Sequence, residues 1–166
     1  MAFYKWVDAS RPDFAMDSYF SNWSAEHQKV LRSRGDKIIV CCYFTVHPAG
    51  RGQNLGLSGK DLLMGMIVET FMNSKADAMT GAVRVNRGVN GAGERWGAAV
   101  IDRNVPSGFE NTPVDLIGFF KDKISNHQPH ELDTLVKTLW NNSFIIPKLS
   151  LDNEFTKKYN RELSVA

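Results

Sequence analysis

The segment from residue 37 to residue 72 constrains the fold more than any other part of the chain. It begins with a nearly continuous apolar run over residues 37–46, which is typical of a β-strand buried on both faces of a sheet. Pro48 has no N–H group for a strand ladder and should end this strand. From Ser58, a good N-cap residue, apolar side chains recur at helical spacing. The sequence therefore predicts a strand, a glycine-rich turn and a helix over residues 58–74.

The turn between this strand and helix reads HPAGRGQNLGLSG over residues 47–59. The backbone N–H groups of such a turn converge at the positive end of the helix dipole, which makes an anion site. Its glycines let the backbone approach a ligand closely, and Arg51 adds a charge that does not titrate. Two interpretations follow: a phosphate-binding turn, or a connection whose glycines serve only for turning.

A family resemblance favours the first interpretation. Val46-His47-Pro48, followed by Arg51-Gly52-Gln53-Asn54-Leu55-Gly56, resembles the pyrophosphate-binding motif of the acyl-coenzyme A N-acyltransferase (GNAT) family. Asn54 stands where the first motif glycine is usual, and Asn tolerates a left-handed backbone well. A second segment matches the family in order and spacing, with a strand at 78–85, Asn86 at its end and Gly97 before the next strand. The resemblance covers residues 37–101.

This resemblance implies acetyl-coenzyme A, or another acyl-coenzyme A, as co-substrate, and acetyl transfer to an amine that the sequence does not identify. It also implies a set of cofactor-binding residues: Val46, Arg51, Gly52, Gln53, Asn54, Leu55, Gly56, Leu57 and Asn86. In that scheme the Val46 backbone meets the pantetheine arm, and Asn86 keeps two strands apart or contacts the same arm. Arg51 and the turn amides hold the pyrophosphate.

The sequence does not identify the residue that would donate or accept a proton during acyl transfer. Many family members carry a tyrosine about four residues before a Gly-Phe pair, and Gly93 occupies that position here. Glu94 and His47 are the remaining candidates for catalytic roles, and His47 has the suitable unperturbed pKa of an imidazole. Two alternatives to the acetyltransferase stay open: a binding or regulatory module that has lost turnover, and a synthase of N-acyl amino acids or acyl-homoserine lactones.

The pattern predicts an α/β (α+β) fold, with a mixed, mostly antiparallel sheet flanked by helices on both faces, in one domain over residues 1–166. Its parts are a shortened front (1–36), an acyl-coenzyme A-binding core (37–124) and a C-terminal helix and tail (125–166). The expected strands are 3–7, 37–46, 78–85, 98–105 and 114–121, with a further edge strand at 144–146. The expected helices are 13–34 in two pieces, 58–74, 130–141 and an amphipathic one over 149–166, with weak helix at 87–95. The strands 37–46 and 78–85 should form the one parallel pair.

The short front is a departure from the family, and it indicates either a shortened variant of the domain or a piece of a longer protein. Aromatic residues there, and Met16, should belong to the core, whereas Asp115 and Asp122 should face solvent or lie in turns. The last helix could pack on the domain or on a second subunit, so a homodimer is one expectation.

Composition excludes several classes of function. A net charge of +2 over 166 residues, without a Lys/Arg block, argues against nucleic-acid binding. No apolar run is long enough to span a membrane, and no signal peptide opens the chain. The four histidines are scattered, so no metal site is predicted. Cys41 and Cys42 are neighbours in a strand and should point to opposite faces, which fits a reduced, cytoplasmic setting.

Overall fold

The computed structural model describes residues 1–20, 23–48, 56–107 and 112–143, and these form a five-stranded sheet with helices on both faces. The strands are β1 (Ala2–Asp8), β2 (Lys37–Phe44), β3 (Ala78–Arg84), β4 (Ala99–Val105) and β5 (Val114–Phe119). The helical elements are η1 (Phe14–Met16), α1 (Ala25–Arg32), α2 (Gly59–Met72), η4 (Val85–Arg87), α3 (Val89–Arg95), α4 (Lys121–Ser125) and α5 (Asp133–Asn141). In the sheet order β1-β2-β3-β5-β4, the neighbours β2 and β3 are parallel and the other pairs antiparallel. The expected α/β class, the mixed sheet and its parallel pair are confirmed.

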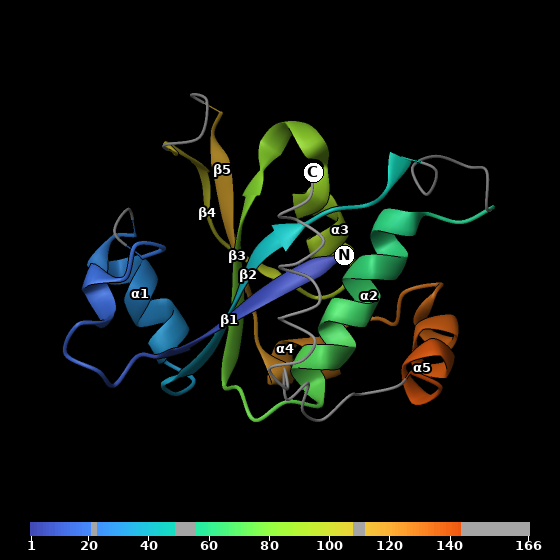
Figure 1. Cartoon of the computed structure of the whole chain (residues 1–166), viewed down its shortest axis with the longest axis horizontal. Helices are drawn as coiled ribbons and strands as arrows, with labels where there is room; N and C mark the ends of the chain where they lie inside the picture. The colour runs from blue at the N-terminus through green and yellow to red at the C-terminus, as the bar shows by residue number, and fades with distance from the viewer. Residues whose placement is uncertain (21–22, 49–55, 108–111, 144–166) are drawn as a thin grey trace, which may run out of the picture.

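Each face of the sheet covers its own hydrophobic core, with α1 on one side and α2, α3 and α5 on the other (Figure 1). We call them the α1-side core and the α2-side core. The α1-side core comprises Ala9, Phe14, Phe20, Trp23, Leu31, Ile38, Val40, Ala78, Val114, Leu116 and Phe120. The α2-side core comprises Ile39, Met64, Ile67, Val68, Phe71, Ala76, Met79, Ala92, Trp96, Ile117, Phe119 and Val136. Successive residues of β2, β3 and β5 enter opposite cores because side chains alternate along a strand.

Helix α2 begins where the sequence predicts. The Ser58 hydroxyl accepts a hydrogen bond from the Asp61 N–H at 3.2 Å, so Ser58 is the N-cap. Asp61 is itself buried, and its carboxylate accepts hydrogen bonds from Arg95 Nη2 and Nε at 2.7 and 3.2 Å. Burial acts to raise the pKa of Asp61, but hydrogen bonds from Ser58 and Arg95 hold that pKa below its usual value. This ion pair fixes the first turn of α2 against α3.

Parallel pairing between β2 and β3 stops early. The two strands pair over three residue pairs, from Ile38–Ala78 to Val40–Thr80. Beyond that point β2 stays paired with β1 as far as Phe44, while β3 stays paired with β5 as far as Arg84. A register shift in the β1–β2 pairing leaves one extra residue on β2 at this point, and such bulges bend a strand and increase its twist. The sheet is therefore split between β2 and β3.

Several predicted boundaries are wrong. Of the two helical pieces expected over 13–34, the second is present as α1, capped by Ser24, but the first is reduced to η1. The helix expected over 130–141 begins at Asp133. The strand expected over 114–121 ends at Phe119, and Lys121 opens the unpredicted helix α4. Met16 is 83% exposed and not part of the core. The elements expected at 144–146 and 149–166 lie outside the described residues.

Asp115 is a further correction, because it is 2% exposed rather than solvent-facing. Its carboxylate accepts hydrogen bonds from Asn90 Nδ2 at 2.8 Å, Arg103 Nη1 at 3.3 Å and the Asn104 N–H at 3.0 Å. Asn104 has a left-handed backbone, with φ of 55°. Buried charge is tolerated when it is paired and hydrogen-bonded, and here it links β5 to β4 and α3.

Candidate functional site at a split in the sheet

A cleft of about 1750 Å³ occupies the split between β2 and β3. From the α2 side it is lined by Cys41, Phe44, Met64, Ile67, Val83 and Ile117, all of which belong to or pack on the α2-side core. From the α1 side it is lined by Tyr19, Trp23, Val105, Val114 and Leu116, which belong to or pack on the α1-side core. Since these two cores lie on opposite faces, the cleft passes through the sheet from one face to the other.

Four of the predicted cofactor-binding residues line this cleft: Val46, Gly56, Leu57 and Asn86. They come from two places that are distant in sequence, the segment before α2 and the end of β3. Gly56 has a left-handed backbone, with φ of +67°, in open space two residues before Ser58, the N-cap of α2. The other five residues of the predicted set, Arg51, Gly52, Gln53, Asn54 and Leu55, lie outside the described residues.

Neither candidate catalytic residue lines the cleft. The Glu94 carboxylate accepts a hydrogen bond from Arg103 Nη2 at 3.0 Å, in the network that joins α3 to β4. His47 comes directly after Val46, which lines the cleft, but His47 is not itself among the lining residues. The geometry thus brings four of the predicted cofactor contacts to one cleft, and neither of the two proton-transfer candidates lines it.

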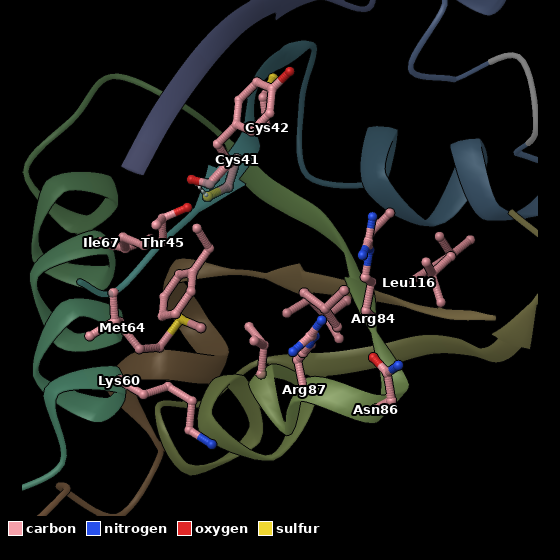
Figure 2. Close-up of a pocket in the computed structure, with 18 of the residues that line it drawn as sticks. Cys41, Cys42, Thr45, Lys60, Met64, Ile67, Arg84, Asn86, Arg87 and Leu116 are labelled. Carbon is pink, nitrogen blue, oxygen red and sulfur yellow. Dashed lines mark hydrogen bonds between the residues drawn. The ribbon is translucent and has the colours of Figure 1, made fainter. Parts of the chain in front are cut away.

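Positive charge gathers on the cleft, and the sequence analysis did not single out its sources. Lys5, Lys60, Arg84 and Arg87 line it, whereas Glu131 is the one acidic residue among its described lining. Lys60 comes from the first turn of α2, and its Nζ donates a hydrogen bond to the Gly88 carbonyl at 2.9 Å. Arg84 ends β3 and Arg87 lies in η4, which leads towards α3 (Figure 2). Arg84 and Arg87 lie within two residues of Asn86, the predicted strand end, and this position in the sequence could have assigned them to the cleft.

Cys41 does not provide a reactive nucleophile. It lies in the wall of the cleft and packs on the α2-side core (Figure 2). Burial, with a smaller contribution from neighbouring Cys42, raises the pKa of the Cys41 thiol to about 11. At neutral pH this group is therefore a thiol, and the thiolate is the nucleophilic form.

Tyr19 places a buried hydroxyl beside the split. Its Oη lies near the Thr80 hydroxyl and the Ala82 backbone, yet makes no hydrogen bond of ordinary length and angle within the described chain. Thr80 Oγ1 instead donates to the Ile117 carbonyl at 2.8 Å. Burial raises the pKa of Tyr19 well above its usual value, so the hydroxyl stays protonated.

Removal of this hydroxyl should therefore not destabilise the protein. Burying a polar group without a partner costs about 1–3 kcal/mol, so Tyr19→Phe should leave the free energy of unfolding unchanged or raise it by up to about 1 kcal/mol. Urea unfolding followed by fluorescence measures this difference. Tyr43→Phe, at a tyrosine that is 67% exposed, is the matched control and should have an effect within about 0.5 kcal/mol. A clear loss of stability in Tyr19→Phe would mean that Oη has a partner in solution.

The described residues contain neither a helix long and apolar enough to cross a membrane nor a group of three or more His, Cys, Asp or Glu side chains that could hold a metal ion. The chain matches no model of a known protein family, and comparisons with curated proteins and with solved structures give no significant match.

Proposed function

We propose that this protein is an N-acyltransferase that moves an acyl group, most simply acetyl, from acyl-coenzyme A to an amine. The observation that carries the proposal is the cleft through the split between β2 and β3, which opens directly beside the start of α2. A transferase that joins two substrates needs a passage in which both meet, and a passage through the sheet lets each enter from its own side. The order of the elements around it, strand, glycine-rich turn, helix and parallel strand, agrees with the GNAT-like sequence motifs.

The chemistry of the α2-side half fits the coenzyme. A pantetheine arm is extended and carries amide groups, so it can pair with the backbone of strands that no longer pair with each other. Phosphates are favoured near the N-terminus of the 14-residue helix α2, with Lys60 and Arg87 as nearby cations. By the sequence motif, Arg51 and the amides of residues 53–57 would complete the pyrophosphate site.

The protein's contribution to the reaction is then positioning and electrostatics. A neutral amine attacks the thioester carbonyl, and the thioester C–S bond breaks to release the thiol. Backbone N–H groups near the end of β2 would stabilise the charge that develops on the carbonyl oxygen. Holding the two reactants in one passage supplies the advantage of proximity. The C–N bond forms as the C–S bond breaks, and ordered water would carry the amine proton to the departing sulfur, which leaves as the thiol.

A second candidate is a module that binds acyl-coenzyme A without turnover. It is favoured by the placement of Glu94 in an ion pair with Arg103 and of His47 away from the cleft lining, which leaves the described cleft without an identified base. It predicts the same cofactor contacts and differs only in the absence of product.

Thermal unfolding and thiol release together test the proposal. Acetyl-coenzyme A at 100 times its Kd should stabilise the protein by about 2.7 kcal/mol, and a panel of amines should then release free thiol. Arg51→Ala should weaken the stabilisation, since it removes the predicted pyrophosphate contact. Stabilisation without thiol release would favour the binding module. If neither acetyl- nor long-chain acyl-coenzyme A shifts the unfolding temperature, both candidates are wrong.

A further inference from the structure

The backbone of β3 opens towards the cleft at Ala82. The Val85 N–H donates to the Pro113 carbonyl at 3.3 Å, and alternate residues of an antiparallel strand bond to the same neighbour. Residues 81, 83 and 85 therefore bond to β5, and the N–H and C=O of Ala82 point towards β2. Pairing between β3 and β2 ends at Thr80, so Ala82 is the first residue of β3 whose backbone faces the split. Its side chain is exposed and lines the cleft.

The hydroxyl of Tyr19 lies at the same opening. Tyr19 lines the cleft, and its buried Oη lies near the Ala82 backbone without an ordinary hydrogen bond in the described chain. Of the three buried side-chain polar atoms without a partner among the described residues, it alone belongs to a residue that lines the cleft. Such a group costs about 1–3 kcal/mol and calls for an explanation at its site. A ligand carbonyl that accepts the Ala82 N–H from within the cleft would meet this hydroxyl.

The front segment holds the hydroxyl in place. The Tyr19 N–H donates to Asp17 Oδ1 at 3.0 Å, and Asp17 also forms an ion pair with Lys5 of β1. The Tyr19 ring packs edge-on against Phe20 and beside Trp23, with centroids 5.0 and 5.9 Å apart. Both neighbours are buried in the α1-side core, so the ring cannot turn away without disturbing that core. A donor that is fixed and shielded from water is preorganised to stabilise developing charge.

We propose that Tyr19 Oη and the Ala82 N–H form an oxyanion hole for the thioester carbonyl of the acyl donor. The inference rests on the proposed function and adds a catalytic residue to it. As the amine nitrogen bonds to the carbonyl carbon, an electron pair moves onto the carbonyl oxygen, which accepts both hydrogen bonds. That pair returns as the C–S bond breaks, and the thiol leaves with the proton that the amine loses. Tyr19 keeps its own proton throughout, in line with its raised pKa.

The carbonyl stretching band of bound acetyl-coenzyme A tests the assignment without requiring turnover. A hydrogen bond to the carbonyl oxygen lowers the frequency of this band. With coenzyme that is isotope-labelled at the thioester carbon, difference infrared spectra should show a lower frequency in the unmodified protein than in Tyr19→Phe. The Kd values of the two proteins should agree within about threefold, because this hydrogen bond strengthens only in the transition state. An equal band position would overturn the inference, whereas absence of any acyl-coenzyme A binding would contradict the proposed function, and the inference with it.

Turnover gives a second readout. Tyr19→Phe should lower kcat for thiol release about 100-fold and change KM for acetyl-coenzyme A by less than about threefold. Tyr43→Phe is the matched control, because it removes the same atom from a tyrosine of the same cleft that is 67% exposed, and it should keep both kcat and the band position. Unchanged kcat in Tyr19→Phe, or an equal loss in Tyr43→Phe, would overturn the assignment. If the unmodified protein binds the coenzyme but releases no thiol, the binding module is favoured and the band position decides the inference.

Discussion

Gly65→Ala should lower the free energy of unfolding by about 2 kcal/mol and the midpoint of thermal unfolding by roughly 5 °C. Gly65 lies in the middle of α2, where an added Cβ would stand 2.6 Å from ring carbons of Trp96 and 2.6 Å from Cγ2 of Val136. All of these atoms belong to the buried α2-side core, so they cannot move aside without disturbing it. Overpacking costs about 1–3 kcal/mol, and contacts at 2.6 Å with two core side chains place this substitution at the upper end, from which the better helix propensity of alanine subtracts about 1 kcal/mol.

Gly91→Ala is the matched control, because it makes the same chemical change in a helix without the contact. An added Cβ at Gly91, in α3, has Arg95 Nη1 at 3.5 Å as its one close neighbour, which is ordinary van der Waals contact with a flexible side chain. This variant should be stabilised by about 0.5–1 kcal/mol. Urea unfolding of both proteins measures the difference. If Gly65→Ala proves as stable as Gly91→Ala, the close approach of α2 to Trp96 and Val136 is wrong.

Ala82→Trp should weaken binding of acetyl-coenzyme A by 100-fold or more while changing the unfolding free energy by less than about 1 kcal/mol. Ala82 lies on β3 just beyond the last residue paired with β2, so its side chain is exposed and lines the cleft. By strand alternation the side chain points to the α1 side with Ala78, so a tryptophan there would block the passage where the thioester end of the coenzyme would emerge from the α2-side half. Titration calorimetry measures the affinity for acetyl-coenzyme A. Unfolding of the ligand-free variant measures the change in unfolding free energy.

Ala25→Trp provides the comparison, since Ala25 is an exposed alanine at the start of α1 that does not line the cleft. It should bind acetyl-coenzyme A as the unmodified protein does. Unchanged binding by a folded Ala82→Trp protein would show that the coenzyme does not use the passage between β2 and β3, and the proposed function would lose its main support.

Helix α2 begins at a position that its own sequence marks. Its start could be predicted because the cap acts within four residues, where the Ser58 hydroxyl meets the Asp61 N–H. The start of α5 could not, because the Leu132 N–H donates a hydrogen bond to the His130 side chain, at Nδ1 and 3.1 Å, so that the residues after Pro129 form a turn and the helix begins only at Asp133. The burial of Asp115 was likewise hidden, because β5 is buried on both faces and its polar partners come from Arg103, Asn90 and Asn104.

Some residues of the candidate site could likewise be placed from the sequence, and others could not. Val46, Gly56, Leu57 and Asn86 could be placed together from two short motifs and their spacing, and they do line one cleft. Tyr19 could not be assigned to it, because nothing in its own neighbourhood of sequence marks it. It reaches the cleft only through the packing of the front segment on the α1-side core.

Local sequence by itself determined the order of strands and helices, the capped start of α2 and the parallel pairing of the two strands that α2 connects. The elements and the cap depend on periodicity and turns, which act over a few residues. The parallel pairing follows from the order strand, helix, strand, because the helix returns the chain to the same end of the sheet. Tertiary structure alone decided that β2 and β3 separate after Val40 and Thr80, and which side chains line the opening. The physical reason is that each strand follows its outer partner, β1 or β5, and those pairings join residues that lie some 30–40 positions apart in the chain.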